Sequence, residues 1–176
     1  ARAFIEAHHA HGVTTTLKHF PGHGSSQADS HLGLVDVSAT WQQLELEPYR
    51  ALIGEGLADS IMTAHVFNSQ LDATYPATLS KAVITDLLRN ELGYDGVVIT
   101  DDMNMGAITQ QYGFEQAAVL AVQAGADVLA YGNNLTYDPD VAQRAIAALL
   151  AAVERGELSE ARIDESYRRV MRLKGV

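Results

Sequence analysis

Residues 96–102 read Gly-Val-Val-Ile-Thr-Asp-Asp, a short run of β-branched side chains that ends in two carboxylates. A run this apolar predicts a strand that is buried on both faces, as the strands of parallel sheets are. Three other runs of the same kind occur at Val13–Leu17, Ser60–Thr63 and Asp127–Tyr131. Each run leads into polar residues and then into a segment of helical periodicity. The sequence therefore predicts an α/β fold of four parallel strand-helix units.

Ordinary helix signals mark the segments between and after these runs. Pro48 suits a first helical turn, while Ser80 and Gly93 suit the start and the end of a second helix. Ser159 suits the start of a C-terminal helix. Helices are also expected at residues 114–124 and 138–155, and residues 1–7 are expected to belong to a helix that starts upstream.

Two architectures contain such units: a small doubly wound sheet and half of an eight-stranded barrel. Neither G-x-G-x-x-G nor G-x-x-x-x-G-K-[ST] follows any of the four runs. The absence of these nucleotide-binding motifs favours the half-barrel. Both architectures place their functional sites beyond the C-terminal ends of the strands, where the polar loops of this sequence lie.

The composition limits the chemistry and the partners of this chain. Its 176 residues suit one domain or a piece of one, and 47% of them are hydrophobic, as in a globular protein. The net charge of -10 opposes binding to nucleic acid and to anionic membrane surfaces, so neither is an expected partner. No cysteine is present, which excludes disulfides, thiolate zinc sites and cysteine nucleophiles. Any chemistry must therefore come from His, Asp, Glu and hydroxyl groups.

The densest group of polar candidates follows the first run. Lys18 and His19 come at the predicted strand end, where they could hydrogen-bond a ligand rich in hydroxyl groups. Asp29 and His31 are two residues apart, so in an extended segment the carboxylate could bond one imidazole nitrogen while the other faces a substrate. This arrangement predicts a proton-transfer dyad. Two alternatives are a metal site that also uses His23, and a loop whose glycines serve only its turns.

Asp101 and Asp102 form the second candidate. Adjacent side chains at a strand end point in opposite directions, so only one of the two carboxylates is expected to face the site. Such a carboxylate could attack as a nucleophile, bind a metal ion or cap the next helix. The histidines at positions 8, 9 and 11 have a structural interpretation, because cations near a helix C-terminus interact favourably with the helix dipole.

Five motifs give the chain a resemblance to glycoside hydrolase family 3, and within it to the bacterial β-N-acetylglucosaminidases of peptidoglycan recycling. In chain order they are Lys18–Gly24, Asp29-Ser30-His31-x-Gly33-Leu34, Met62–His65, Gly96–Met105 and Leu158–Asp164. The Lys-His-Phe string is shared with β-glucosidases of the family. The Asp-x-His loop resembles the acetylglucosaminidase branch specifically.

The resemblance implies a mechanism. Asp101 would be the nucleophile that forms a glycosyl-enzyme intermediate, and His31, oriented by Asp29, would act as general acid and then as general base. Lys18 and His19 would hold sugar hydroxyls beside the scissile bond. The implied activity is that of a retaining β-N-acetylhexosaminidase (EC 3.2.1.52 type) that acts on peptidoglycan-derived saccharides in the cytoplasm without a cofactor or metal.

The resemblance also implies that residues 1–176 are the second half of a (β/α)₈ barrel whose N-terminal half is absent. Such a barrel typically needs about 250 residues, and four units cannot close one. The chain is therefore expected to pair with the missing half-barrel or to self-associate, and alone it could be inactive. The alternatives are a phosphorylase or β-glucosidase of the same family, and a non-catalytic fragment that only binds or assembles with a partner.

Overall fold

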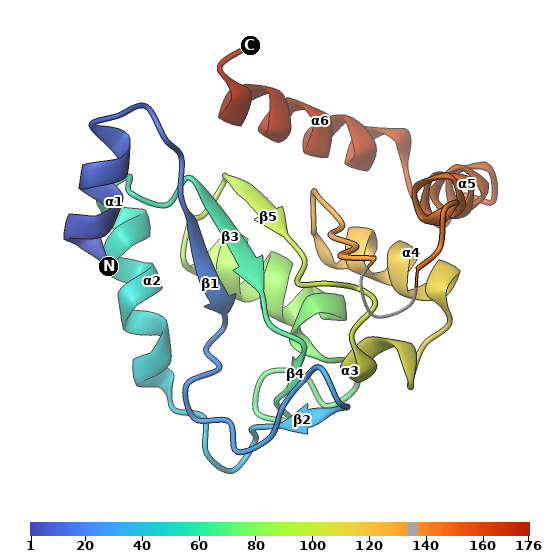
Figure 1. Cartoon of the computed structure of the whole chain (residues 1–176), viewed down its shortest axis with the longest axis horizontal. Coiled ribbons are helices and arrows are strands. Elements are labelled where there is room, and N and C mark those ends of the chain that lie inside the picture. Colours follow the sequence, from blue (N-terminus) through green and yellow to red (C-terminus); the bar gives the residue numbers. More distant parts are fainter. Residues whose placement is uncertain (134–136) are drawn as a thin grey trace.

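The computed structural model describes residues 1–133 and 137–176 (Figure 1). Its central sheet contains β1 (Thr16–Phe20), β3 (Ser60–Thr63) and β5 (Val97–Ile99), which are parallel and lie in the order β1-β3-β5. The chain is thus an α/β fold with parallel strands, as predicted.

Helices follow or cover these strands at the places that the capping residues indicated. Ser80 accepts a hydrogen bond from the Val83 N–H (3.1 Å), and Ser159 accepts one from the Arg162 N–H (3.2 Å).

A short second sheet, not predicted, lies beyond the ends of β1 and β3. The remaining elements are α1 (Arg2–His9), β2 (Val35–Asp36), the 3-10 helices η1 (Gln43–Leu46) and η2 (Ala77–Leu79), α2 (Glu47–Gly54), β4 (Val66–Phe67), the π-helix η3 (Ala82–Glu91), α3 (Gly106–Thr109), α4 (Phe114–Ala124), α5 (Val141–Glu154) and α6 (Glu160–Lys174).

The first strand lies further along the chain than the predicted run Val13–Leu17. Val13 is 48% exposed, and the N–H of Thr15 donates to the carboxylate of Asp59 (2.7 Å). Because that side chain takes the N–H, strand pairing begins only at Thr16. Lys18 and His19 consequently belong to β1 and do not follow it.

The fourth predicted strand, Asp127–Tyr131, is reduced to a single bridge between Val128 and Ile99. The Thr100 N–H donates to the Val128 carbonyl (3.0 Å), but the next N–H along, that of Ala130, donates to the Thr100 hydroxyl (2.9 Å). A side chain interrupts the ladder at this point. The prediction of a fourth strand was therefore wrong in extent, although the segment does lie in parallel beside β5.

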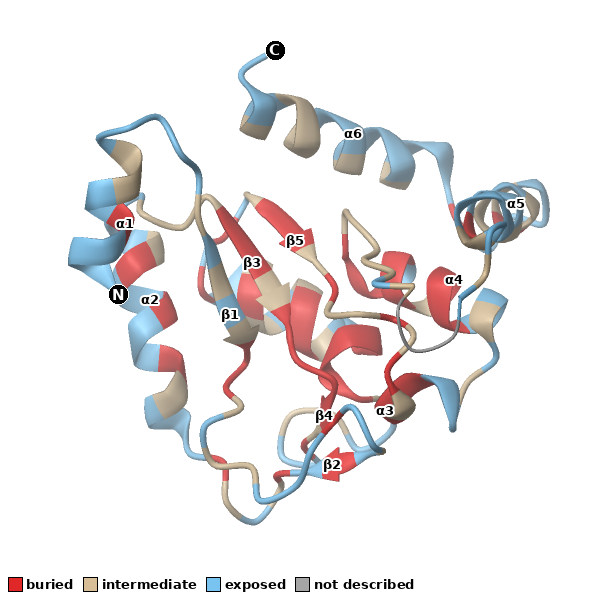
Figure 2. Cartoon of the chain, viewed as in Figure 1, coloured by how far each residue is buried: buried red, intermediate tan, exposed pale blue. Residues whose placement is uncertain are grey.

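The core lies between the sheet and the helices that follow its strands (Figure 2). Ile61 of β3 and Val98 of β5 are fully buried, whereas β1 alternates between exposed and half-buried residues until Phe20. Among the described residues β1 pairs only with β3, so its other edge is free. Among the residues that the structure describes, no helix is both long enough and apolar enough to cross a membrane.

A buried ion network closes the N-terminal end of the sheet, where α6 crosses (Figure 1). Its centre is Asp127, whose side chain has no exposed surface. Burial opposes ionisation of this carboxyl, but nearby cations and hydrogen bonds outweigh the burial and hold its pKa below the ordinary value. The carboxylate accepts hydrogen bonds from Arg89 (2.7 Å), Arg162 (3.3 Å), Arg169 (3.3 Å), Ser166 (2.8 Å) and the Val98 N–H (3.0 Å).

Candidate active site

Polar side chains gather at the opposite, C-terminal end of the sheet. His19 comes from β1, His65 follows β3, and Asp101 follows β5. His19 Nε2 lies 3.6 Å from Asp101 Oδ2. Residues more than 80 positions apart in the chain therefore meet because their parallel strands end side by side, which is where α/β folds place their sites.

Asp101 has one carboxylate oxygen, Oδ2, without a hydrogen-bond partner among residues 1–133 and 137–176. Its Oδ1 accepts a hydrogen bond from the Asp102 N–H (2.8 Å), and its side chain is 20% exposed. Burial lowers the pKa of His19, and the attraction of Asp101 offsets this only in part. At neutral pH His19 is consequently an uncharged hydrogen-bonding group beside the carboxylate. It does not neutralise the negative charge of Asp101. Asp101 has the geometry of a nucleophile with a free oxygen.

The side chain of Asp102 has a structural role. Its Oδ1 accepts hydrogen bonds from the N–H groups of Asn104 (2.9 Å) and Gly132 (3.0 Å). These bonds tie the turn after β5 to the segment after the reduced fourth strand. The expectation that only one of the two neighbouring carboxylates faces the site agrees with this arrangement.

Asp29 and His31 are in contact, as predicted. His31 Nδ1 lies 2.7 Å from Asp29 Oδ1, and the same oxygen accepts the His31 backbone N–H (2.9 Å). That backbone hydrogen bond and the one from the imidazole lower the pKa of Asp29. The expected extended segment is instead a turn, because the Leu32 N–H donates to the Asp29 carbonyl (3.1 Å). An aspartate that bonds the backbone two residues on is typical of such turns. Among the described residues, Nε2 of His31 has no hydrogen-bond partner.

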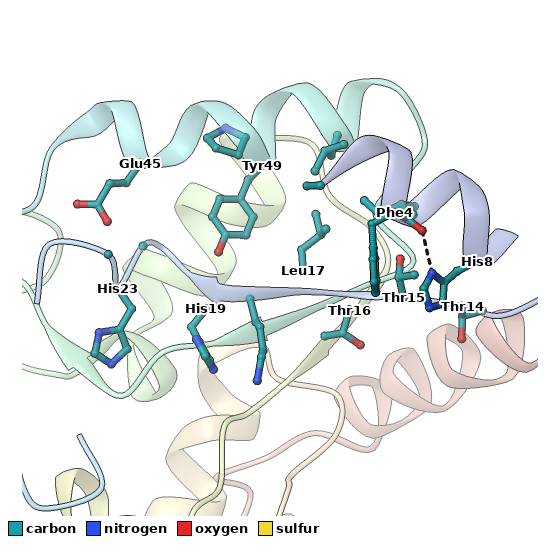
Figure 3. Close-up of a pocket in the computed structure, with 17 residues that line it drawn as sticks. Phe4, His8, Thr14, Thr15, Thr16, Leu17, His19, His23, Glu45 and Tyr49 are labelled. Atoms are coloured by element: carbon teal, nitrogen blue, oxygen red, sulfur yellow. Dashed lines mark hydrogen bonds between the residues drawn. The ribbon is translucent and has the colours of Figure 1, made fainter. Parts of the chain in front are cut away.

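Lys18 and His19 line a groove of about 960 Å³ that wraps the free edge of β1. Figure 3 shows His19 and His23 on one side of the strand, with Leu17 and Tyr49 on the other side beneath α2. Neither Asp101 nor His31 lines this groove. The structure therefore brings His19 both to Asp101 and to the groove, which Lys18 also lines.

Three other histidines, His8, His9 and His23, form hydrogen bonds within the fold. His23 bonds the hydroxyls of Ser26 and Ser30, the latter at 3.2 Å. His8 Nδ1 bonds the Phe4 carbonyl (2.8 Å), and His9 Nε2 bonds Asp59 (2.7 Å). Within the described ranges, no three His, Asp or Glu side chains form a group able to hold a metal ion.

His65 is a site residue to which the sequence analysis gave no role. It is fully buried, its Nε2–H donates to the Asp102 carbonyl (2.9 Å), and its Nδ1 lies 2.8 Å from the Thr78 hydroxyl. Burial lowers the pKa of His65, and the Thr78 hydroxyl that lies beside Nδ1 donates to the Ala64 carbonyl (2.9 Å). Thr63 Oγ1 completes the chain of bonds, 2.8 Å from Thr78 Oγ1. The signal in the sequence was a histidine placed directly after an apolar strand.

The fold and the site together define the class of this protein. It is an α/β protein whose parallel sheet carries His and Asp side chains at its C-terminal end. Residues 1–173 match the glycosyl hydrolase family 3 N-terminal domain. The chain belongs to glycoside hydrolase family 3.

Relatives place it near the hexosaminidases of that family. A beta-hexosaminidase of Tolumonas auensis is 40% identical over 137 residues, which are 76% of this chain and 41% of that protein. The structure of a family 3 beta-N-acetylglucosaminidase from Paenibacillus sp. str. FPU-7 is 45% identical with a TM-score of 0.88, over 97% of this chain and 32% of that one. A beta-N-acetylhexosaminidase from Beutenbergia cavernae is 35% identical with a TM-score of 0.89, over 100% of this chain and 51% of that one. The chain thus spans about half of these relatives or less.

Proposed function

We propose that this chain carries the reacting groups of a retaining β-N-acetylglucosaminidase. The observation that carries the proposal is the pairing of His31 with Asp29 at 2.7 Å, in a chain that also holds Asp101 at a strand end with a free oxygen. Two displacements then follow. Asp101 attacks the anomeric carbon while His31 protonates the leaving oxygen, and His31 next takes a proton from the water that releases the sugar.

His19 and Lys18 hold sugar hydroxyls in this proposal. The neutral imidazole of His19 both donates and accepts hydrogen bonds, and the Lys18 ammonium donates. The proposed specificity for N-acetylated sugars rests on the relatives, whose names state hexosaminidase or acetylglucosaminidase activity. Saccharides derived from peptidoglycan are the substrate class that the resemblance favours.

The chain is proposed to be the second half of the catalytic barrel. The free edge of β1 and the groove along it support this, because an unpaired parallel strand requires a neighbour on that side. The remaining barrel strands would fill this edge. We call this chain together with those strands, in one polypeptide or two, the completed barrel.

The test compares the completed barrel with the 176-residue chain alone. We expect the chain alone to self-associate in light scattering and to show little activity. The completed barrel should hydrolyse 4-nitrophenyl N-acetyl-β-glucosaminide faster than the β-glucoside and release the β-anomer first, as seen by proton NMR. No turnover of either substrate by the completed barrel would point to a non-catalytic assembly fragment, and a compact, active monomer would contradict the half-barrel.

The role of His31 has its own test. In the completed barrel, His31→Ala should impair substrates with poor leaving groups by about 10²-fold or more, while an acidic nitrophenol leaves with little protonation. Equal losses on both substrates would identify a structural histidine. Adding inorganic phosphate tests the phosphorylase alternative, which a histidine acid/base favours because it adds no negative charge to repel phosphate as a carboxylate would. A sugar 1-phosphate product would replace hydrolysis with phosphorolysis in the proposal.

A further inference from the structure

The dyad loop, residues 29–33, docks on α3, the short helix that follows Asp101 along the chain. The N–H of Gly106 donates to the His31 carbonyl (3.1 Å), and the N–H of Ala107 donates to the Ser30 carbonyl (3.3 Å). Nε2 of Gln110, the residue that directly follows this helix, donates to the Leu32 carbonyl (2.9 Å). Three consecutive carbonyls of the loop are therefore held by α3 and its C-cap residue.

The same helix is tied to the turn that carries Asp101. Met105 is buried, and its N–H donates to the Asp102 carbonyl (3.0 Å), which also accepts the bond from His65. The path from Asp101 to α3 is thus short and hydrogen-bonded. α3 thus connects the turn that carries Asp101 to the loop that carries His31.

Gly106 allows this close docking because it lacks a side chain. A Cβ at this position would lie 2.9 Å from the His31 carbonyl oxygen, which is closer than real Cβ atoms approach other atoms, and 3.0 Å from the Leu32 carbonyl carbon, which is tighter than most Cβ contacts. The positive-φ glycines of the chain do not include Gly106, so its backbone conformation does not require glycine. Glycine also weakens a helix relative to alanine. The contact with the loop is the feature that explains a glycine here.

The side chains of the dyad are loosely packed, although Ser30 between them is buried and its hydroxyl bonds His23 Nε2 (3.2 Å). The side chains of His31 and Asp29 are 62% and 57% exposed, so packing does not fix their place. A general acid must nevertheless sit within hydrogen-bond reach of the leaving oxygen. A displacement of about 1 Å can cost roughly 10²-fold in rate.

We infer that Gly106 and Gln110 are positioning residues that fix the Asp29–His31 dyad relative to Asp101. Gly106 acts by the absence of a side chain, which lets the loop reach the helix. Gln110 acts through its amide, which holds the Leu32 carbonyl. The inference rests on the proposed function for its effect on catalysis, while the docking itself is a separate, measurable contact.

The main experiment is Gly106→Ala in the completed barrel. Because the added methyl pushes the dyad loop away, we expect a loss of about tenfold or more on an alkyl or disaccharide N-acetylglucosaminide, and less than about threefold on the nitrophenyl substrate. The matched control is Gly54→Ala, another helical glycine without positive φ, which has nothing within 4 Å of its Cβ position. The control should leave both rates unchanged. Equal losses on the two substrates, or none, would overturn the inference.

Gln110→Met provides a second variant, since it keeps the size of the side chain and removes the amide. It should show the same dependence on the leaving group, with a smaller loss. Hydrogen exchange supplies a readout that does not need activity: the Gly106 and Ala107 amides should exchange faster in Gln110→Met than in the wild type. Unchanged protection would refute the docking role. If the wild type turns over no glycoside while protection still falls, the docking holds and the proposed function fails.

Discussion

Asp101 and Asp127 lie at opposite ends of the same sheet and have opposite surroundings. Asp127 has no exposed surface, and three guanidinium groups, a hydroxyl and a backbone N–H share its two oxygens. Asp101 is 20% exposed and accepts one backbone N–H on Oδ1, while its Oδ2 faces His19 at 3.6 Å. A carboxylate whose lone pairs are all used stabilises the fold, and one with a free oxygen is available for chemistry. In barrels of this type stability and reactivity are divided between the two ends of the sheet.

The largest effect that separates the two ends is expected from Asp101→Asn in the completed barrel. The amide cannot form a glycosyl ester, so turnover of the aryl N-acetylglucosaminide should fall by about 10³-fold or more. The oxygen of the new side chain can still accept the Asp102 N–H, so the free energy of unfolding should change by less than about 0.5 kcal/mol. Urea unfolding followed by circular dichroism measures the second quantity. Full activity in this variant would remove Asp101 from the mechanism.

The reverse outcome is expected for Asp127→Asn. Removing the charge leaves Arg89, Arg162 and Arg169 without their shared partner, and breaking a buried ion pair in this way costs about 3–5 kcal/mol. The folded fraction of the variant should keep a normal KM, because the network lies at the far end of the sheet. Stability within about 1 kcal/mol of the wild type would show that the network is not needed for the fold.

A smaller effect, on both quantities together, is expected at His65. His65→Leu removes one of the two hydrogen bonds that the Asp102 carbonyl accepts and one of the partners of the Thr78 hydroxyl, at a cost of about 0.5–1.5 kcal/mol for each bond lost. Turnover should fall by about tenfold, since the turn that carries Asp101 loses one support. His65→Gln keeps a donor near the position of Nε2 and should recover most of the activity. Failure of glutamine to do better than leucine would count against the hydrogen bond to Asp102.

The smallest effect is the dependence of stability on pH, which should occur in two windows. Burial lowers the pKa of His65 and of His19, so the unfolded chain takes up protons that the folded chain refuses as the pH falls below the ordinary value of 6.5. Stability should therefore decline first in that window. The contribution of Asp127, whose folded pKa is lowered, is present above 3.8 and is lost only as the pH falls below that value. His65→Gln should weaken the first decline and leave the second unchanged.

Much of the fold could be read from periodicity and caps. The helix at residues 114–124 and the caps at Ser80 and Ser159 were predicted because their signals are local. The shortened fourth strand was not, since it depends on a hydroxyl, that of Thr100, taking a bond from another segment. The late start of β1 depends in the same way on Asp59, a residue distant in sequence.

In the candidate site, too, local contacts could be predicted from the sequence and contacts between distant segments could not. The contact between Asp29 and His31 was predictable because the two residues are two positions apart, so local backbone geometry alone brings their side chains together. The role of His65 and the docking of the dyad loop on Gly106 were not, because each joins loops that follow different strands. A sequence shows which groups could react, whereas the supports that set their distances arise from the fold.

The most direct test of the account is to trap the covalent intermediate in the completed barrel. A fluorinated N-acetylglucosaminide with an activated leaving group slows release of the sugar, so the glycosyl enzyme accumulates and can be digested for mass spectrometry. The account predicts one modified peptide, with the sugar on Asp101 and none on Asp102 or Asp127. A sugar on another carboxylate, or complete turnover with inversion and no adduct, would contradict it.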